Sequence, residues 1–534
     1  MRQALSPAHT VVVLRVYPRG RRGKKRNLLL RDLAGKAPVP EIVAGVSEGY
    51  RQAGGNLPPY WPDFSRQLRP LAQPKASPVR TSRPNSYPNS ATWQVFVRLS
   101  LNMFGKPRIV FIAVLCSLLR AATLAPPFDV AQEAGKRNNM LSAWLEFRDH
   151  DVEYRADPEL GRMYVAAASW VNSYVGEYRA ALGLTAAQGT PPAADDPELR
   201  RTLRKYQPVD ALEAIAAATR DRRVVMINEE HRDSSHRAFT TELLPILRQQ
   251  GFRYLAAEAF GADIETAHYP KSGRFYIDDS VFADMIRRAL ELGFTLLPYD
   301  VPTACSDAEM KAFNTNGFGS LGSNNCMEGR ELGQARNLAK FIEAHPDAKL
   351  LVHAGAGHIQ KIEFPFGPLM ALDFRNLTKI DPLCIDQNYM SEREGEDPQY
   401  TTIAARFADR TAPFALRSGS EFFLPDAADG IDIPVIHPRA RYQNGRPAWL
   451  ATGGWRKPVP IADLPAYKAA APELRKAGTT LLQAFAITDE SDAVPVDQFL
   501  IADPMKPVPL MLPQGKYRVR VIDGAGKTLV AFGL

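Results

Sequence analysis

The chain has 534 residues, of which 45% are hydrophobic, and its formal net charge is +8. This charge is unevenly distributed, because residues 1–102 contain 17 Lys and Arg against 4 Asp and Glu, whereas the rest of the chain contains 49 against 54. The globular part is therefore slightly acidic, and we expect no nucleic-acid partner.

The first 102 residues are rich in Arg, Pro, Ser and Asn and show little periodic apolar pattern. Such a segment cannot bury enough apolar surface to offset the entropy of folding, so we expect a disordered leader. Met103 follows it, and we expect translation to begin there in the native gene. Residues 1–102 then belong to an over-extended gene prediction and are not translated.

Residues 103–125 have the pattern of a secretory signal peptide. Lys106 and Arg108 precede an apolar run over 109–119, and small residues follow it. The run is too short for a comfortable membrane span, and a buried core helix is the alternative. We therefore expect a periplasmic or secreted protein that has no stable membrane anchor after the signal is cleaved.

Four cysteines occur in the chain, and Cys116 leaves with the expected signal peptide. Export permits disulfides. Cys305 and Cys326 flank a stretch rich in Gly, Asn and Ser, so a bridge that clamps this loop and a pair of free thiols both stay open. Cys384 lies in an apolar run, which indicates a buried thiol.

The mature chain divides into three expected parts. In residues 137–190 apolar and aromatic side chains recur at helical intervals. Residues 205–390 alternate helices and strands, which predicts an α/β domain with a mainly parallel sheet flanked by helices. After a polar, acidic break over 392–399, residues 401–534 contain many prolines, short β-like runs and a terminal hairpin signal, which predict a β-rich accessory domain.

Within the α/β region each expected helix leads into a strand. The pairs, in chain order, are helix 210–220 with strand 223–228, helix 235–250 with strand 253–257, helix 280–292 with strand 295–298, and helix 326–344 with strand 349–354. The apolar run over 368–374 is expected to be a further strand.

Polar side chains follow these strands at the point where each one ends. His231 comes after the first strand, Glu258 after the second, Asp300 after the third and His358 after the fourth. Ligands bind at the carboxyl edge of an open parallel sheet, so we expect His231, Glu258 and His358 to converge on one site. Histidine with carboxylate can bind a divalent metal or perform acid–base chemistry. Asp300 is expected to cap a turn with Pro302.

The other histidines of the globular part have simpler interpretations. His353 lies on a strand and is expected to be a core residue. His437 is expected to be structural. His236 begins a helix, where it either faces the site or contacts solvent.

Asn228-Glu-Glu-His231 follows the first strand, Glu258 the second, and Gly355-Ala-Gly-His358 the fourth. These elements resemble the erythromycin esterase, ChaN and Tiki superfamily, which has Gly-x-x-His after its first strand, Glu after the second and another Gly-x-x-His late in the domain. Residues 330–337, which begin with Arg330, also resemble its Arg-Asp-x-x-Met-Ala-x-Asn element. The resemblance covers roughly residues 205–390.

One departure concerns Asn228, which stands where the family has Gly. Asn accepts left-handed dihedrals better than most residues, so we expect the turn to survive with some change in substrate or metal placement. The resemblance implies that His231 is a general base or metal ligand and that Glu258 orients it or shares the metal. It also implies that His358 completes the site and that Arg330 stabilises developing negative charge.

Three classes of function stay open. The first is an exported hydrolase, metal-assisted or dependent on His and Glu, that acts on a small-molecule or peptide substrate. The second is a haem- or metal-binding protein without turnover, and the third is a degenerate member that binds a partner through its β domain. The chain has no P-loop, no Gly-x-Ser-x-Gly elbow and no Cys-x-x-Cys pair, so nucleotide-binding, serine-hydrolase and thioredoxin-like interpretations have no support. The oligomeric state is left open.

Overall fold

The structure is a computed structural model. It describes residues 12–18, 26–29, 93–99, 124–184, 196–301, 306, 326–364, 367–426 and 428–534. Residues Ala125–Leu534 form one compact unit, separate from Met1–Leu124. Nearly all of the expected signal peptide lies outside the described residues.

The described part of the leader consists of three strands. These are β1 (Val12–Pro18), β2 (Arg26–Leu29) and β3 (Trp93–Leu99), which pair antiparallel in the order β2-β1-β3. Each strand is rich in Val, Leu or aromatic residues, which favour extended backbone. The composition of the leader as a whole does not reveal these short segments.

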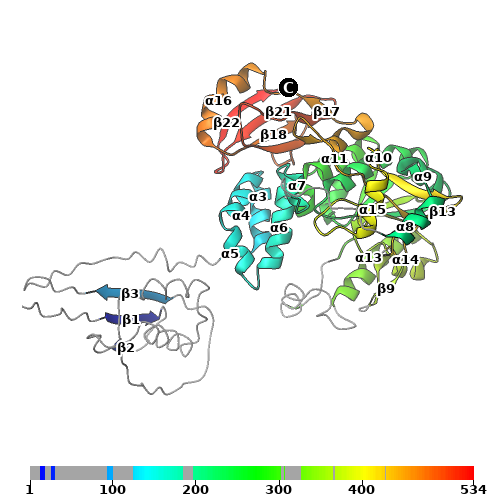
Figure 1. Ribbon diagram of the computed structural model, residues 1–534, viewed down its shortest axis with the longest axis horizontal. Coiled ribbons are helices and arrows are strands. Elements are labelled where there is room, and N and C mark those ends of the chain that lie inside the picture. Colours follow the sequence, from blue (N-terminus) through cyan, green and yellow to red (C-terminus); the bar gives the residue numbers. More distant parts are fainter. Residues whose placement is uncertain are drawn as a thin grey trace, which may run out of the picture. The chain divides into compact units, whose positions relative to one another are not determined.

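Five helices open the compact unit and pack against one another (Figure 1). They are α3 (Pro127–Lys136), α4 (Met140–Asp149), α5 (Asp151–Ala156), α6 (Gly161–Tyr174) and α7 (Tyr178–Ala181). Their core is aromatic, with the Tyr154 and Tyr164 rings stacked at 4.8 Å and Phe147 edge-on to both. We call α3–α7 the helical bundle.

The central sheet has six parallel strands in the order β14-β11-β5-β8-β6-β7, which confirms the predicted mainly parallel sheet. The strands are β5 (Val224–Glu229), β6 (Tyr254–Ala257), β7 (Thr295–Pro298), β8 (Leu350–Gly355), β11 (Leu383–Asp386) and β14 (Ile433–Pro434). Every residue of β5 and β8 is buried. Such strands are covered on both faces and have near-continuous apolar sequences.

Side chains of β5 alternate between two helical layers. Val225 and Ile227 pack with α9 (Ala211–Ala218), α10 (Ser234–Gln249) and α11 (Ser280–Glu291). Val224 and Met226 pack with α13 (Cys326–Ala344) and α14 (Met370–Thr378). By the period of two, Glu229 lies on the α10 side and Asn228 on the α13 side.

The segment 368–374 was predicted as a strand, and this prediction is wrong, because α14 occupies Met370–Thr378. A short apolar run has no periodicity that separates a strand from a buried helix. The left-handed residue Lys379 (φ 62°) ends the helix, and the chain then enters β11. Cys384 in β11 is a buried free thiol, as expected. Cys326 is disulfide-bonded, whereas Cys305 lies outside the described residues.

The chain beyond 392–399 returns to the α/β layers. Helix α15 (Pro398–Arg406) follows the break, and β12 (Phe414–Ser418) pairs with β4 (Gln207–Asp210) and with β13 (Glu421–Phe422). Strand β14 then pairs with β11. The central sheet therefore draws on residues on both sides of that break.

The C-terminal part is antiparallel, as the β-rich prediction requires (Figure 1). Its main sheet has the order β19-β18-β21-β22, with β18 (Thr480–Ala486), β19 (Asp497–Ile501), β21 (Tyr517–Ile522) and β22 (Thr528–Gly533). Helix α16 (Pro465–Ala477) packs against it. Smaller pairs in this part join β15 (Tyr442–Gln443) to β16 (Arg446–Pro447) and β17 (Lys457–Val459) to β20 (Leu510–Leu512). Another small pair, β9 (Glu363–Phe364) with β10 (Gly367–Pro368), lies in the α/β region.

Charged contacts join this β-rich part to the α/β layers. Arg456 is buried and donates to Asp284 of α11 at 2.8 Å. Arg287 of α11 donates to Asp489 at 2.6 Å. Removing one partner of a buried pair leaves an uncompensated charge, so these contacts favour a fixed junction. Across the described ranges, no helix is both long and apolar enough to cross a membrane.

Candidate active site

Asn228 lies inside β5 and does not form a turn. It is not among the residues with positive φ, so the expected left-handed turn is wrong. Its side-chain nitrogen donates to Asp386 at 2.6 Å and to the Ala356 carbonyl at 2.9 Å, and its side-chain oxygen accepts from the Gln387 N–H at 2.7 Å. Asn228 thus crosslinks β5 to the ends of β8 and β11, which a glycine could not do.

The last residue of β5, Glu229, holds His231. The Nδ1 atom of His231 lies 2.8 Å from Oε1 of Glu229. Arg237, which is fully buried on α10, donates to both oxygens of Glu229 at 2.6 and 2.8 Å and to Asp279 at 2.5 Å. Burial raises the pKa of Glu229, but Arg237 and His353 outweigh it and hold that pKa well below its ordinary value. An ionised Glu229 requires a proton on Nδ1 of His231, so Nε2 is left as the acceptor.

His236 fixes the turn that presents His231. The backbone N–H of Glu230 donates to Nδ1 of His236 at 3.0 Å. Burial lowers the pKa of His236 to about 3, so it is a neutral acceptor. His236 is fully buried, with its ring 4.8 Å from that of His437, so the alternative that it contacts solvent is wrong. His437 is also buried and lies 3.2 Å from Gln387, which agrees with a structural role.

Glu258 follows β6, and the cationic side chains of Arg330 and His358 lie next to it. It accepts the Gly355 N–H at 2.7 Å and Arg330 at 2.7 Å. Burial raises the pKa of Glu258. The charges of His358, His231 and Arg330 have a larger effect in the opposite direction, so the pKa of Glu258 lies well below its ordinary value. Glu258 is therefore ionised at neutral pH.

Asp300 belongs to the same cluster. Arg330 donates to Asp300 at 2.8 and 3.1 Å, and Gln334 donates to it at 2.6 Å. Pro302, its expected turn partner, lies outside the described residues. Asp300 and Glu258 thus share Nη2 of Arg330 as a donor, and together they hold its side chain.

His358 is held as a cation. Its Nδ1 lies 2.7 Å from Glu331, an ion-pair contact without aligned hydrogen-bond geometry, and its Nε2 lies 3.6 Å from Glu258. Burial lowers the pKa of His358, but Glu331 and Glu258 raise it to about 10. Arg330 approaches Nε2 at 3.4 Å, so two cations lie side by side among three carboxylates.

Gly355 leaves room for His231 and Glu258 to lie close together. A Cβ atom at this position would lie 2.8 Å from Nε2 of His231 and 2.9 Å from Oε2 of Glu258. The absence of a side chain therefore allows His231 and Glu258 to approach the same point above β8. His353 lies below, buried and 3.6 Å from Glu229, as its strand position predicted. The four predicted site residues His231, Glu258, His358 and Arg330 are thus brought together.

Several residues of this cluster were not predicted from the sequence. They are Arg237, Glu331, Trp170 and Tyr276. Glu229 was noted at the end of the first strand but was given no role in the site. Glu331 is next to the predicted Arg330, and this adjacency was the available signal. The Tyr276 ring stacks on that of His231 at 4.1 Å, and no local pattern around residues 170 or 276 indicates this contact.

The donors as arranged do not fit a divalent metal. Among the described residues, no three His, Cys, Asp or Glu side chains are grouped so that they could hold one. Of the expected ligands, Glu258 already binds Arg330, and Glu331 and Glu258 raise the pKa of His358 to about 10, which disfavours its neutral, metal-binding form. The guanidinium of Arg330 lies against both Glu258 and Asp300, where a metal ion would need those oxygens.

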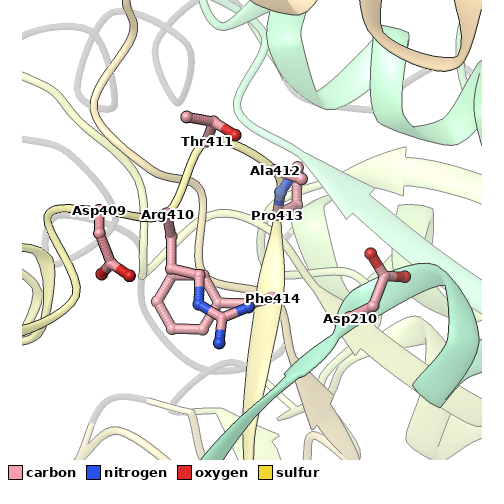
Figure 2. Close-up of a pocket in the computed structure, with 7 residues that line it drawn as sticks. All are labelled: Asp210, Asp409, Arg410, Thr411, Ala412, Pro413 and Phe414. Carbon is pink, nitrogen blue, oxygen red and sulfur yellow. The ribbon is translucent and has the colours of Figure 1, made fainter.

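A separate surface pocket lies between the ends of β4 and β12. Figure 2 shows its lining, which consists of Asp210, Asp409, Arg410, Thr411, Ala412, Pro413 and Phe414. Asp210 caps α9 by accepting the Glu213 N–H at 3.0 Å. The pocket shares no residue with the His231 cluster, so we assign it no part in that site.

Neither the known protein families nor the curated proteins gave a match to this sequence. Among solved structures, the type III effector HopBA1 aligns with a TM-score of 0.27 and 14% identity over 44% of this chain and 96% of that chain. RRSP, a MARTX toxin effector domain from Vibrio vulnificus, aligns with a TM-score of 0.25 and 14% identity over 49% and 55% of the two chains. Likenesses at this level carry no argument about function.

Proposed function

We propose that this cluster is the active site of an exported hydrolase in which His231 is the general base. The observation that supports the proposal is the pair of Glu229 and His231. A buried, ionised carboxylate contacts Nδ1 at 2.8 Å and leaves Nε2 as a proton acceptor. The His231 side chain is 23% exposed, so this nitrogen belongs to a group that solvent and substrate can reach.

Water is the proposed nucleophile. Among the described residues, no serine, threonine or cysteine side chain hydrogen-bonds to the His231 ring, whose partner is Glu229. In the first step Nε2 takes a proton from water while the water oxygen forms a bond to the substrate's carbonyl carbon. In the second step the bond to the leaving group breaks, and the leaving oxygen or nitrogen takes that proton from His231.

Arg330 and His358 supply the positive charge that the first step needs. Negative charge develops on the carbonyl oxygen, and donors that are already fixed in place stabilise it most effectively. Asp300 and Glu258 hold Arg330, and Glu331 holds His358. No step in this scheme uses a metal ion.

The first test measures turnover. The full chain is assayed against chromogenic esters and anilides, together with His231→Gln and the control His345→Gln. His345 is exposed at the end of α13, where its ring stacks on Phe341. We expect His231→Gln to lower kcat at least about 100-fold, the range of a lost general base, with an unchanged melting temperature. Equal kcat values for the two variants would refute the role of His231.

A second measurement separates hydrolysis from binding. Metal analysis and an absorption scan of the purified protein are expected to show neither a stoichiometric metal nor a haem band. Stoichiometric haem without turnover would replace the hydrolase with a haem-binding protein. N-terminal sequencing of the native protein tests export, since we expect a mature chain that begins after the 103–125 segment.

A further inference from the structure

A continuous group of aromatic rings lies beside His231. Tyr276 stacks face to face on His231, with centroids 4.1 Å apart and planes at 16°. Trp170 lies edge-on to both, 5.0 Å from Tyr276 and 6.2 Å from His231. Phe275 and Phe128 extend the group, at 6.3 and 5.0 Å from Trp170. We call Phe128, Trp170, Phe275 and Tyr276 the aromatic wall.

The aromatic wall combines two parts of the chain. Phe128 and Trp170 come from α3 and α6 of the helical bundle, whereas Phe275 and Tyr276 come from the 3₁₀ helix η4 (Phe275–Asp278), which precedes α11. All four residues keep a minor part of their surface exposed, whereas core aromatics of the α/β layers such as Phe282 are fully buried. The wall therefore lies beside His231 at the edge of the interior and is not completely enclosed.

The backbone that presents the wall is strained and firmly held. Phe275 has φ 40°, a conformation that bulky residues rarely adopt and that costs roughly 1–3 kcal/mol. Asp278 fixes the preceding turn by accepting the N–H groups of Gly273 at 2.7 Å and Arg274 at 3.1 Å. Arg274 is in turn paired with Asp263. Strain of this kind concentrates at ligand sites, which favours a binding role over simple packing.

The charges around the wall select against anionic ligands. Each cation of the site is already paired, Arg237 with Glu229, Arg330 with Glu258, and His358 with Glu331. Because Arg330 and His358 already have carboxylate partners, they can donate to a developing oxyanion but offer little net positive charge to hold a ligand that is anionic before reaction. The ligand that fits best is not anionic, and a neutral ester or amide meets this condition.

We propose that the aromatic wall binds a planar, apolar group of an uncharged ester or amide substrate, and that Trp170 makes the helical bundle part of the substrate site. This inference rests on the proposed hydrolase function. Stacked and edge-to-face ring contacts would orient the carbonyl group toward His231. Trp170 is then a specificity-determining residue supplied from outside the α/β layers.

The test compares two esters that share a leaving group. Ethyl phenylacetate carries a planar ring, and ethyl cyclohexylacetate carries a puckered ring at the same position. We expect Trp170→Leu to raise KM for the phenyl ester about 3- to 10-fold, in line with one lost ring contact, and to leave kcat and the cyclohexyl ester nearly unchanged. Trp170→Phe should restore most of the affinity. Trp144→Leu, in α4 of the same bundle, is the control and should match the wild type.

A binding measurement keeps the two proposals separate. Titration calorimetry with 1-phenylpentan-2-one and 1-cyclohexylpentan-2-one, ketone analogues of the two esters, needs no turnover. Preferential binding of the phenyl ketone that is lost in Trp170→Leu supports the wall even if neither ester is hydrolysed. Equal loss of both ligands, or no change in either, overturns the inference, and hydrolysis that still depends on His231 would leave the proposed function standing.

Discussion

The sharpest prediction concerns Gly355, because one methyl group there should separate His231 from Glu258. The backbone of Gly355 does not have a positive φ, so alanine fits without backbone strain. Its Cβ would lie 2.8 Å from Nε2 of His231 and 2.9 Å from Oε2 of Glu258. Ordinary carbon contacts begin at about 3.5 Å, so His231 or Glu258 must move by about 0.5–1 Å.

This displacement gives the expected magnitudes. A shift of about 1 Å in a catalytic group can cost about 100-fold in rate. The added methyl group should lower the free energy of unfolding by only about 1–3 kcal/mol, the usual cost of overpacking. We therefore expect Gly355→Ala to remain folded and to lose kcat about 10- to 100-fold.

The assay has a matched control two residues away. A Cβ at Gly357 would meet no atom within 4 Å, so Gly357→Ala should keep full activity. Steady-state kinetics on any hydrolysed ester, together with thermal melts, compares the two variants. Full activity in Gly355→Ala would mean that the approach of His231 to Glu258 is irrelevant to catalysis.

Four further predictions concern stability. Burial lowers the pKa of His353 to about 4. In the unfolded chain this histidine has a pKa near 6.5, so between pH 4 and 6.5 the unfolded state binds more protons than the folded state. Thermal melts should therefore show that the protein loses stability as the pH falls from about 6.5 to 4. The pKa of His358 is raised to about 10 in the folded protein, so its contribution to the free energy of unfolding should disappear as the pH rises from about 6.5 to 10. A Tm that is flat over this range would contradict this prediction. Arg237→Leu should cost about 3–5 kcal/mol in urea unfolding, since it leaves buried carboxylates unpaired, whereas Arg232→Leu, at a half-exposed pair, should cost less than about 1 kcal/mol. A chain ending after Glu394 should lose its cooperative melt, because β14 and β12 are removed from their sheets, and a cooperative melt in that fragment would show that the α/β layers fold alone.

The positions of His231, Glu258 and His358 could be predicted from the sequence because each follows a strand with a strong apolar signal. The parallel arrangement then places strand ends at one edge, whatever the rest of the chain does. Their charge partners could not be predicted in this way. Arg237 is paired with Asp279, 42 residues away, and such a contact depends on how α10 and α11 pack.

Some strands and strand residues could not be predicted because the local sequence has no pattern that identifies them. The two-residue strand β14 has no periodicity to detect, and its place beside β11 is fixed by tertiary contacts. Asn228 shows a related limit. The sequence alone suggested a turn residue, whereas three partners at the ends of β8 and β11 hold it in the strand. Trp170 illustrates the largest gap, since its helix lies outside the region that resembles the family.

The strand order has a consequence for synthesis of the protein. Strand β5 is the first strand of the central sheet to leave the ribosome, yet its neighbours β8 and β11 end only at residues 355 and 386. Both edges of β5 are unpaired until β8 is made, and one stays unpaired until β11 is made, which is the condition under which chains associate with one another. A ribosome that stalls before residue 386 should therefore release a fragment that depends on chaperones or is degraded.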